Sequence, residues 1–564
     1  MYLFSKHPLF LAVIINVFFI FVTHFFGVIM FGISDDYAMA RILEGAYGDD
    51  YDVHMTFINV VYGYALLPLY HLFPKIGWYY IGETFAVFAS FTTISYVIVR
   101  LLGVRLGSIL AMLFLTVFVS DFYLALQFTQ CASALTAAGI ILFVFGMLSI
   151  GPDERWNGII VLVLSLFFML WGAVMRYEAF LMGMPFFAVL LAVNCKYMCK
   201  KKLFIVFLSL LVACTFGLKK IDQLAYSSPE YQTYIDFQKA RVRLNDFHAT
   251  DDGKIYEDLE ELGHWGDDFN MVRNWRFYDN EVFSIRNLSI FDSVLNAHAI
   301  KKDPDELIYS AINILPRYTE YPIVWFWMLI SFLLILTNYK KSYVVWCLLA
   351  LILCYIGYFL SLARFVYHVE SGLWLYAIVV LIPCFPSVSD INKKFNLYFP
   401  RTISSAIITF VAVLNVFIYA TDREYVHTPY YSKKISKWVC DYAGFFKYVD
   451  SLPDSTLFMI SPSMGMSLEI NKIPPYLSEM FGSRNRFVPE GGWTMYFPSM
   501  EREFRKRGME NPLRDVINDN VLVVGDSKLS NFLTSHYYDS VIVDTVRDFN
   551  GIGVYKYSLV KDSL

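Results

Sequence analysis

The chain has 564 residues, of which 57% are hydrophobic, 18% aromatic and only 17% charged, and its mean hydropathy is +0.47. Soluble domains carry about 25% charged residues, so this composition excludes an ordinary soluble protein and indicates a polytopic membrane protein. The formal net charge of −4 identifies no partner, because membrane proteins sort their charges by side of the membrane. The sequence has no basic stretch suited to a nucleic acid.

Twelve apolar runs are candidates for membrane segments, since a helix needs about 20 apolar residues to cross a bilayer. The first run, residues 9–31, is too long for a signal peptide and is not followed by a cleavage site, so we interpret it as a retained span. The other runs are residues 56–73, 78–99, 106–120, 131–149, 158–174, 179–194, 203–217, 321–338, 342–361, 371–386 and 402–420. Two long segments, residues 218–320 and 421–564, are not spans; in the first, residues 265–268 and 275–279 have helix-like spacing.

The distribution of Lys and Arg indicates how these runs cross, because cytoplasmic loops are enriched in both residues. If the N-terminus is cytoplasmic and all twelve runs cross, the basic residues near positions 200, 340 and 393 fall outside. If residues 56–73 do not cross, these basic residues become cytoplasmic and the short outer loops keep few. We therefore predict eleven spans plus one interfacial helix at residues 56–73, whose Tyr and Pro content suits the membrane surface.

This topology predicts a polytopic α-helical protein of the cell (plasma or inner) membrane. Residues 1–420 form the transmembrane domain, with outer loops at 32–77 and 218–320, and residues 421–564 form an extracytoplasmic soluble α/β domain. Strand-like runs occur at 456–460, 521–524, 540–543 and 553–557, and a helical run occurs at 500–507. The alternative topology, twelve spans with an external N-terminus, leaves Asp35 and Asp36 in the cytoplasm.

Two adjacent acids, Asp35 and Asp36, follow the first span directly and are candidate catalytic residues. A carboxylate beside another, at the edge of an apolar region, has its pKa raised and can then accept a proton from an acceptor hydroxyl or amine. The same pattern also fits a helix start, because Asp is favoured at an N-cap and in the first turn. One Asp can serve as the cap while the other acts in catalysis.

Charged residues at the outer ends of the spans are candidates for binding a phosphate. Arg176 and Glu178 lie between two spans, and Arg364 and His368 lie in the matching outer turn before the span at 371. Arg can hold a phosphate with its fork of donors at this depth. Glu83, in the outer third of its span, is a further candidate. The alternatives for these residues are snorkelling and structural Arg–Glu pairing.

The order of these features resembles the GT-C superfamily of integral-membrane glycosyltransferases. A single first span, an outer loop opening with paired acids, an interfacial helix and a span ending in basic residues make up the resemblance. It is greatest to the bacterial branch that uses polyprenyl-phosphate sugars, which includes protein-mannosyltransferase-like and aminoarabinose-transferase-like enzymes. It covers about residues 1–200 and rests on Ser34-Asp35-Asp36-Tyr37, residues 64–73 (YALLPLYHLF), residues 99–103 (VRLLG), Gln127-Phe128-Thr129-Gln130 and Arg176-Tyr177-Glu178.

The resemblance implies a transferase that moves a sugar from a polyprenyl-phosphate donor to an envelope acceptor on the outer face. The acceptor would be a glycan, a lipid or a protein, and membrane lipid would be a further partner. Asp35 or Asp36 would be the base or the acceptor-orienting group, and Arg176 and Arg364 would hold the donor phosphate. The long 218–320 loop departs from the family and leaves the acceptor open.

Other functions and a metal remain open at this point. An envelope-polymer polymerase or ligase is a close alternative, and a transporter or scaffold for envelope glycans without chemistry is a more distant one. A transporter would show repeated halves and charges at the membrane midplane, whereas the charges here gather at one face. The sequence identifies no metal ligand set or certain cofactor; two adjacent acids fit a divalent cation only with further oxygen ligands.

Overall fold

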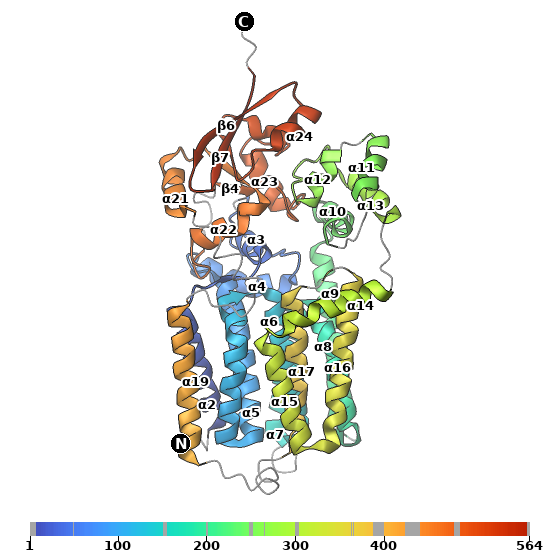
Figure 1. Ribbon diagram of the computed structural model, residues 1–564, viewed down its shortest axis with the longest axis vertical. Helices are drawn as coiled ribbons and strands as arrows, with labels where there is room; N and C mark the ends of the chain where they lie inside the picture. Colours follow the sequence, from blue (N-terminus) through green and yellow to red (C-terminus); the bar gives the residue numbers. More distant parts are fainter. Residues whose placement is uncertain are drawn as a thin grey trace.

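The computed structural model describes residues 7–48, 50–149, 155–198, 201–246, 252–263, 266–298, 304–362, 364, 366–386, 400–422, 440–478 and 486–560. Long apolar helices form a bundle, and a smaller part that contains both helices and strands lies at one end of it (Figure 1). The protein is therefore a polytopic helical membrane protein with a C-terminal α/β region, as predicted.

The bundle accounts for the predicted membrane segments. Within the described residues, nine helices are long and apolar enough to cross a bilayer, and a tenth span is reached if the bent pair α14 and α15 is counted as one. The helices are α2 (Pro8–Phe26), α5 (Trp78–Val119), α6 (Phe128–Ser149), α7 (Arg155–Met175), α8 (Tyr177–Met198), α9 (Lys202–Ala225), α15 (Pro322–Thr337), α16 (Ser342–Ser361), α17 (Tyr367–Leu381) and α19 (Arg401–Thr421).

The long helix α5 contains two spans, not one. Its 42 residues would extend about 63 Å if straight, about twice the hydrocarbon thickness of a bilayer. Gly103 interrupts it with a non-helical φ of 71°. The ring centroids of Phe91 and Phe114 lie 5.2 Å apart, whereas a straight helix would separate them by about 35 Å. The chain therefore turns back at Gly103, and the described residues provide the eleven predicted spans.

Helix α4 (Val60–Leu72) is the apolar run that was predicted not to cross. It has 13 residues, about 20 Å, and contains Pro68, so it is too short for the bilayer core. The Asn59 side chain caps it by accepting a hydrogen bond from Val61 N at 3.0 Å. Figure 1 shows α4 lying across one end of the bundle.

Apart from the turns between spans, the described elements outside the bundle lie at that same end (Figure 1). They include α3 (Ser34–Leu43), α4, the segment between α9 and α15, and the C-terminal region. The turn at Gly103, flanked by Arg100 and Arg105, and the turn at η2 (Tyr339–Lys341) lie at the opposite end. Arg100, Arg105, Lys340 and Lys341 thus lie at the end of the bundle away from α3.

The segment between α9 and α15 is helical throughout most of its described length. Residues 266–268 of the predicted helical stretch are in α12, but residues 275–279 are not helical, and Trp275 has a φ of 63°. Trp265 lies outside the described residues. The helices are α10 (Pro229–Asp246), α11 (Asp252–Glu261), α12 (Gly266–Arg273), α13 (Ile285–Ala297) and α14 (Pro304–Tyr318).

The C-terminal region is built on one five-stranded sheet of order β4-β3-β5-β7-β6. Strands β3 (Leu457–Ile460), β4 (Phe487–Pro489) and β5 (Val521–Val524) are parallel, and β6 (Val541–Asp548) and β7 (Gly553–Leu559) add an antiparallel hairpin. The four strand-like runs of the sequence correspond to β3, β5, β6 and β7. The three-residue strand β4 was not predicted. The helices are α21 (Tyr442–Ser451), α22 (Pro462–Lys472), α23 (Pro498–Lys506) and α24 (Leu529–His536).

Candidate functional site

A two-residue strand pairing brings the two helix starts of the site together. Strand β1 (Met30–Phe31), directly after the first span, pairs in parallel with β2 (Ala125–Leu126), and Gly32 N donates to Leu126 O at 2.7 Å. Helix α3 begins three residues after β1, and α6 begins two residues after β2. The chain therefore places the acids of α3 against the N-terminus of α6, where free amides favour negative charge.

Asp36 occupies this position and is fully buried. Its Oδ1 accepts a hydrogen bond from the Tyr79 hydroxyl at 2.8 Å and one from Phe128 N at 3.3 Å. Burial raises the pKa of Asp36 well above its ordinary value, and the nearby charge of Asp35 adds to the increase, while the Tyr79 and Phe128 hydrogen bonds oppose it. A buried carboxyl group held in this way is suited to fixing the positions of Tyr79 and the start of α6.

Glu83 lies next to Asp36 and is also fully buried. As two ionised carboxylates, Asp36 Oδ2 and both Glu83 oxygens have no hydrogen-bond donor among the described residues. Missing donors and the repulsion between two negative charges would both destabilise a doubly ionised pair. Two buried acids within hydrogen-bonding reach avoid this destabilisation by sharing one proton. We interpret Asp36 and Glu83 as one singly charged unit.

Arg176 lies on the other side of Phe128. Its guanidinium carbon is 5.4 Å from the ring centroids of both Phe57 and Phe128, and one of its nitrogens donates to Phe57 O at 3.3 Å. Its Nε lies 3.0 Å from Glu178 Oε2. Glu178 is 70% exposed, so it accompanies Arg176 at the surface and does not enter the site. Arg176 and Asp36 thus contact the same residue, because Arg176 lies on the Phe128 ring and Asp36 accepts a hydrogen bond from Phe128 N.

The second outer turn joins the same region. His368 lies in the first turn of α17, and the positive charges of Arg364 and Arg176 both act on its ring. Arg364 follows α16, and its backbone N donates to Phe359 O at 3.0 Å. Two arginines from separate turns therefore lie near one histidine at the end of the bundle. This is a positively charged region of the kind that a phosphate group requires.

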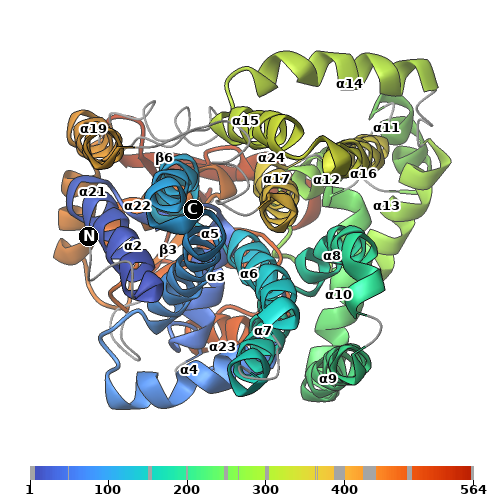
Figure 2. The same cartoon turned by 90° about the horizontal axis from the view of Figure 1, so that it is seen from below.

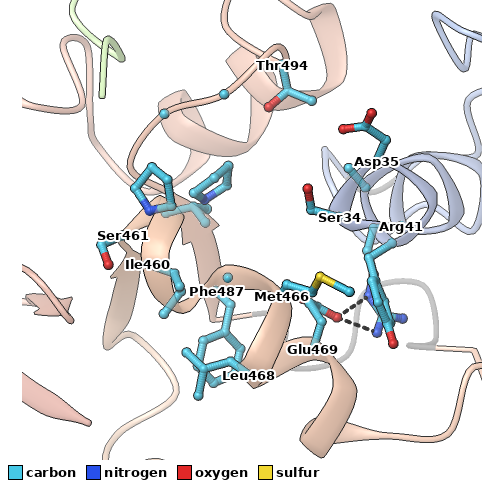
Figure 3. Close-up of a pocket in the computed structure, with 18 of the residues that line it drawn as sticks. Ser34, Asp35, Arg41, Ile460, Ser461, Met466, Leu468, Glu469, Phe487 and Thr494 are labelled. Atoms are coloured by element: carbon cyan, nitrogen blue, oxygen red, sulfur yellow. Dashed lines mark hydrogen bonds and ion pairs between the residues drawn. The ribbon is translucent and has the colours of Figure 1, made fainter. Parts of the chain in front are cut away.

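Asp35 faces in a different direction from Asp36. It is partly exposed and lines a cavity of about 290 Å³ between α3 and the C-terminal region. Trp493 Nε1, from the loop after β4, donates a hydrogen bond to Asp35 Oδ1 at 3.0 Å. Figure 3 shows Ser34 and Asp35 projecting from α3 toward the residues of the C-terminal region across the cavity.

Trp493 also joins the two sides of the site. Its ring centroid is 5.0 Å from that of Phe57, and the Phe57 ring in turn stacks on Phe128 at 6.0 Å. The rings of Trp493, Phe57 and Phe128 therefore form a continuous series of contacts from Asp35 in the cavity to Arg176. No local pattern singles out Trp493, because it is 458 residues from its partner in the chain.

The position of α3 is fixed by a buried ion pair with the C-terminal region. Arg41 lies 2.6 Å from Glu44, the residue that follows α3, and 2.8 Å from Glu469 of α22, and it is only 5% exposed. The dashed lines in Figure 3 mark the pair with Glu469. Because both partners are largely out of solvent, breaking the pair would leave an uncompensated buried charge. Arg41 and Glu469 therefore hold α3 and α22, which line the cavity from two sides, in a fixed position relative to each other.

The alternative that the two acids are an N-cap is not supported by their contacts. Ile33 is the N-cap of α3 and makes no side-chain capping bond. Asp36 bonds to Tyr79 and to the start of α6, and Asp35 bonds to Trp493. Both acids lie in the first turn of α3, where the dipole favours them, but the hydrogen bonds to Tyr79, Phe128 and Trp493 reach to other parts of the protein.

The described residues contain no group of three or more His, Cys, Asp or Glu that could hold a metal ion. Asp36 and Glu83 would offer carboxylate oxygens, but a hard divalent cation needs about six oxygen ligands. The residues present do not fit such a site, and no step of a reaction is derived through a metal.

The fold has solved counterparts, although no protein-family model and no curated protein matches the sequence. ArnT from Cupriavidus metallidurans in the apo state aligns with a TM-score of 0.50 at 10% identity over 97% of each chain. ArnT bound to undecaprenyl phosphate aligns at 0.42 and 11% identity over 98% of each chain. Archaeoglobus fulgidus oligosaccharyltransferase AglB, with an inhibitory peptide and a dolichol-phosphate, aligns at 0.44 and 12% identity over 92% of this chain and 69% of its own.

ArnT and AglB are membrane glycosyltransferases of the GT-C superfamily. The likeness to ArnT extends over nearly the whole chain, including the C-terminal region and the segment between α9 and α15. The present chain therefore has the GT-C fold, as the resemblance in its first 200 residues predicted.

Proposed function

We propose that this protein is a membrane glycosyltransferase that moves a sugar from a polyprenyl-phosphate donor to an acceptor outside the cytoplasm. The observation that carries the proposal is the placement of Arg176 on Phe128, whose backbone amide bonds to Asp36. A phosphate at Arg176 would lie at the membrane edge, beside the acids of α3. ArnT, whose fold the chain shares, is known with undecaprenyl phosphate bound.

The two sides of the site suit two substrates. Arg176, Arg364 and His368 would bind the donor phosphate, with the lipid tail lying along the bundle. The cavity at Asp35 would receive the acceptor, because it opens between α3 and the water-soluble C-terminal region. Asp36 and Glu83 would be positioning residues that hold the start of α3 against α6.

The reaction follows from this arrangement. Asp35 would accept the proton of an acceptor hydroxyl as its oxygen attacks the anomeric carbon of the sugar. The bond between this carbon and the phosphate oxygen breaks, and polyprenyl phosphate leaves as an anion. The arginines would stabilise the negative charge that develops on the phosphate. A phosphate leaves without a proton from the enzyme, so electrostatic stabilisation would supply most of the rate enhancement.

The site would lie on the extracytoplasmic side. The charge distribution supports this orientation, because Arg100, Arg105, Lys340 and Lys341 lie at the end of the bundle opposite to α3. A cysteine in place of exposed Ser34 tests it directly. In intact cells, a membrane-impermeant maleimide should label the Ser34→Cys variant without disruption of the membrane, and labelling only after disruption would contradict the proposed side.

Binding of undecaprenyl phosphate to the purified protein tests the donor site. We expect the wild type to bind the lipid and Arg176→Ala to bind it about 10- to 100-fold more weakly, the effect of losing one charge-assisted contact. Arg100→Ala is the matched control, since Arg100 is also a basic residue at a span end, with its guanidinium 6.0 Å from the Phe145 ring, but lies at the other end of the bundle. Equal affinity of both variants would remove Arg176 from the donor site.

A further inference from the structure

Helix α14 lies across the end of the bundle as a separate element. The helical residues 308–318 make an angle of 88° with the following helix, Pro322–Thr337, which is part of the membrane bundle. Figure 1 shows α14 nearly level at the same end as α4, and Figure 2 shows the two helices on opposite sides of the bundle. An element perpendicular to the spans runs parallel to the membrane plane.

The side chains of α14 divide into three faces. One apolar face packs toward the bundle and contains Ala311, Ile314 and Tyr318. A second apolar face points away from the protein, and its exposed fractions are 58% for Ile308, 68% for Tyr309, 54% for Ile312 and 58% for Leu315. On a helical projection, the polar residues Glu306, Ser310, Asn313 and Arg317 share the remaining face, and the outward face carries one charged residue, Asp305 in the first turn.

The outward apolar face continues the lipid-facing surface of the neighbouring spans. Trp325 and Phe332 on α15 and Tyr358 on α16, against which α14 packs, are all more than half exposed. The Trp325 indole nitrogen donates to Thr319 O at 3.0 Å, directly at the bend between α14 and α15. An indole at this position is typical of the boundary between lipid and water. The Trp325 indole therefore indicates that the bend lies at this boundary, independently of the exposed apolar face of α14.

We propose that α14 is embedded in the headgroup region of the lipid bilayer, with Ile308, Ile312 and Leu315 reaching the acyl chains. The partner is the bilayer itself, because the apolar face is continuous with exposed residues of two spans and the polar residues, apart from Asp305, lie on another face of the helix. A helix with one apolar and one polar side, lying in the membrane plane, binds in this way.

The contacts of α14 link this lipid-embedded helix to the candidate donor site. Arg317 forms an ion pair with Glu370 of α17, which is buried in the bundle. Tyr321, in the bend, stacks edge-on against Tyr367 at 5.1 Å. His368 lies between these two contacts in the sequence and feels the charges of Arg176 and Arg364. We infer that the lipid-embedded α14 fixes the start of α17 and thereby the position of His368. The consequence for donor binding rests on the proposed function.

Labelling of the full-length protein in phosphatidylcholine nanodiscs tests the membrane contact. A water-soluble maleimide is added to the Ile312→Cys and Asn313→Cys variants, and mass spectrometry of the peptides separates these sites from the native cysteines. Ile312 and Asn313 are both exposed on the protein surface, so a difference between their labelling rates reports contact with lipid. We expect Ile312→Cys to react at least about 10-fold more slowly, as for a side chain in the acyl layer. Equal rates would overturn the proposal, and denatured protein serves as the reference for equal intrinsic reactivity.

Undecaprenyl phosphate binding in the same nanodiscs tests the link to the donor site. Ile312→Asp should weaken binding by about 3- to 10-fold because a charge opposes insertion of the apolar face, and Asn313→Asp should not. Unchanged binding by Ile312→Asp would overturn the link to α17 but not the membrane contact. If the wild type itself does not bind the lipid, the proposed function fails, whereas the labelling experiment still decides the position of α14.

Discussion

The acids Asp35 and Asp36 lie in opposite environments, although they are consecutive in the chain. Asp36 is fully buried, accepts two hydrogen bonds from the bundle and shares its surroundings with Glu83. Asp35 lines a cavity and accepts a hydrogen bond from the C-terminal region. The first turn of α3 therefore directs one carboxyl group toward the helical bundle and the other toward the C-terminal region.

This difference assigns separate roles to the two residues. A group that takes a proton from an acceptor must be reachable by that acceptor, and Asp35 meets this condition. A buried group that bonds to Tyr79 and to the start of α6 is suited to fixing geometry. The predictions below separate these roles by the quantity that each substitution changes.

The largest expected effect is that of Asp35→Asn on catalysis. An amide cannot accept the acceptor's proton, so kcat should fall by about 10²- to 10⁴-fold, the usual contribution of a general base, while donor binding stays unchanged. Ser34→Ala is the control, because Ser34 lines the same cavity without a carboxyl group. Steady-state kinetics with a saturating donor measures the effect. Full activity of Asp35→Asn would remove the base assignment.

Asp36→Ala should act on stability more than on binding. It leaves the Tyr79 hydroxyl and Phe128 N without their acceptor, and unpaired buried polar groups cost about 1–3 kcal/mol each. Thermal unfolding in detergent should show a lower midpoint than for the wild type, and Asp36→Asn, which retains an acceptor oxygen, should lose less. A variant as stable as the wild type would contradict the holding role of Asp36.

Trp493→Phe should have a moderate effect on the acceptor side. The ring and its packing on Phe57 remain, but the hydrogen bond to Asp35 is lost. We expect kcat to fall about 10-fold, because a hydrogen bond to a charged group is worth about 1.5 kcal/mol at the lower end. Trp275→Phe, on another wall of the cavity, is the matched control. If both variants retain wild-type kcat, Trp493 does not position Asp35.

The smallest effect is the pH dependence of stability that Asp36 contributes. Its pKa is raised on folding, so the folded state holds more protons than the unfolded state above the ordinary pKa of Asp, and stability falls as the pH rises. Asp36→Asn removes this titration. The stability of the variant relative to the wild type should therefore increase between about pH 4 and the raised pKa of Asp36. A difference that is independent of pH would show that Asp36 is not held in its protonated form.

Local patterns predicted the membrane architecture well, for physical reasons visible in particular elements. The apolar runs became spans, and the Pro and Tyr residues of 56–73 correctly indicated that α4 does not cross. Helix α14 was not recognised, because its apolar residues are interleaved with Ser310 and Asn313 and resemble an ordinary amphipathic helix. The three-residue strand β4 is too short to form a pattern.

The candidate site could be predicted only in part. Asp35, Asp36 and Arg176 stand out as charges beside apolar runs, and Glu83 as an acid within one. Their partners do not, because the contacts are distant in sequence: Tyr79 reaches Asp36 across 43 residues, and Glu469 reaches Arg41 across 428. The different directions of Asp35 and Asp36 depend on the β1–β2 pairing, which no local pattern reveals.

The most direct measurement of the central claim follows both products of transfer at once. Purified protein in nanodiscs is supplied with a polyprenyl-phosphate donor labelled in its sugar, together with an extract of envelope acceptors. We predict that labelled acceptor and free polyprenyl phosphate form in equal amounts with the wild type and that both form about 10²- to 10⁴-fold more slowly with Asp35→Asn. Donor that binds to the wild type but yields neither product would contradict a transferase and indicate a binding or transport protein.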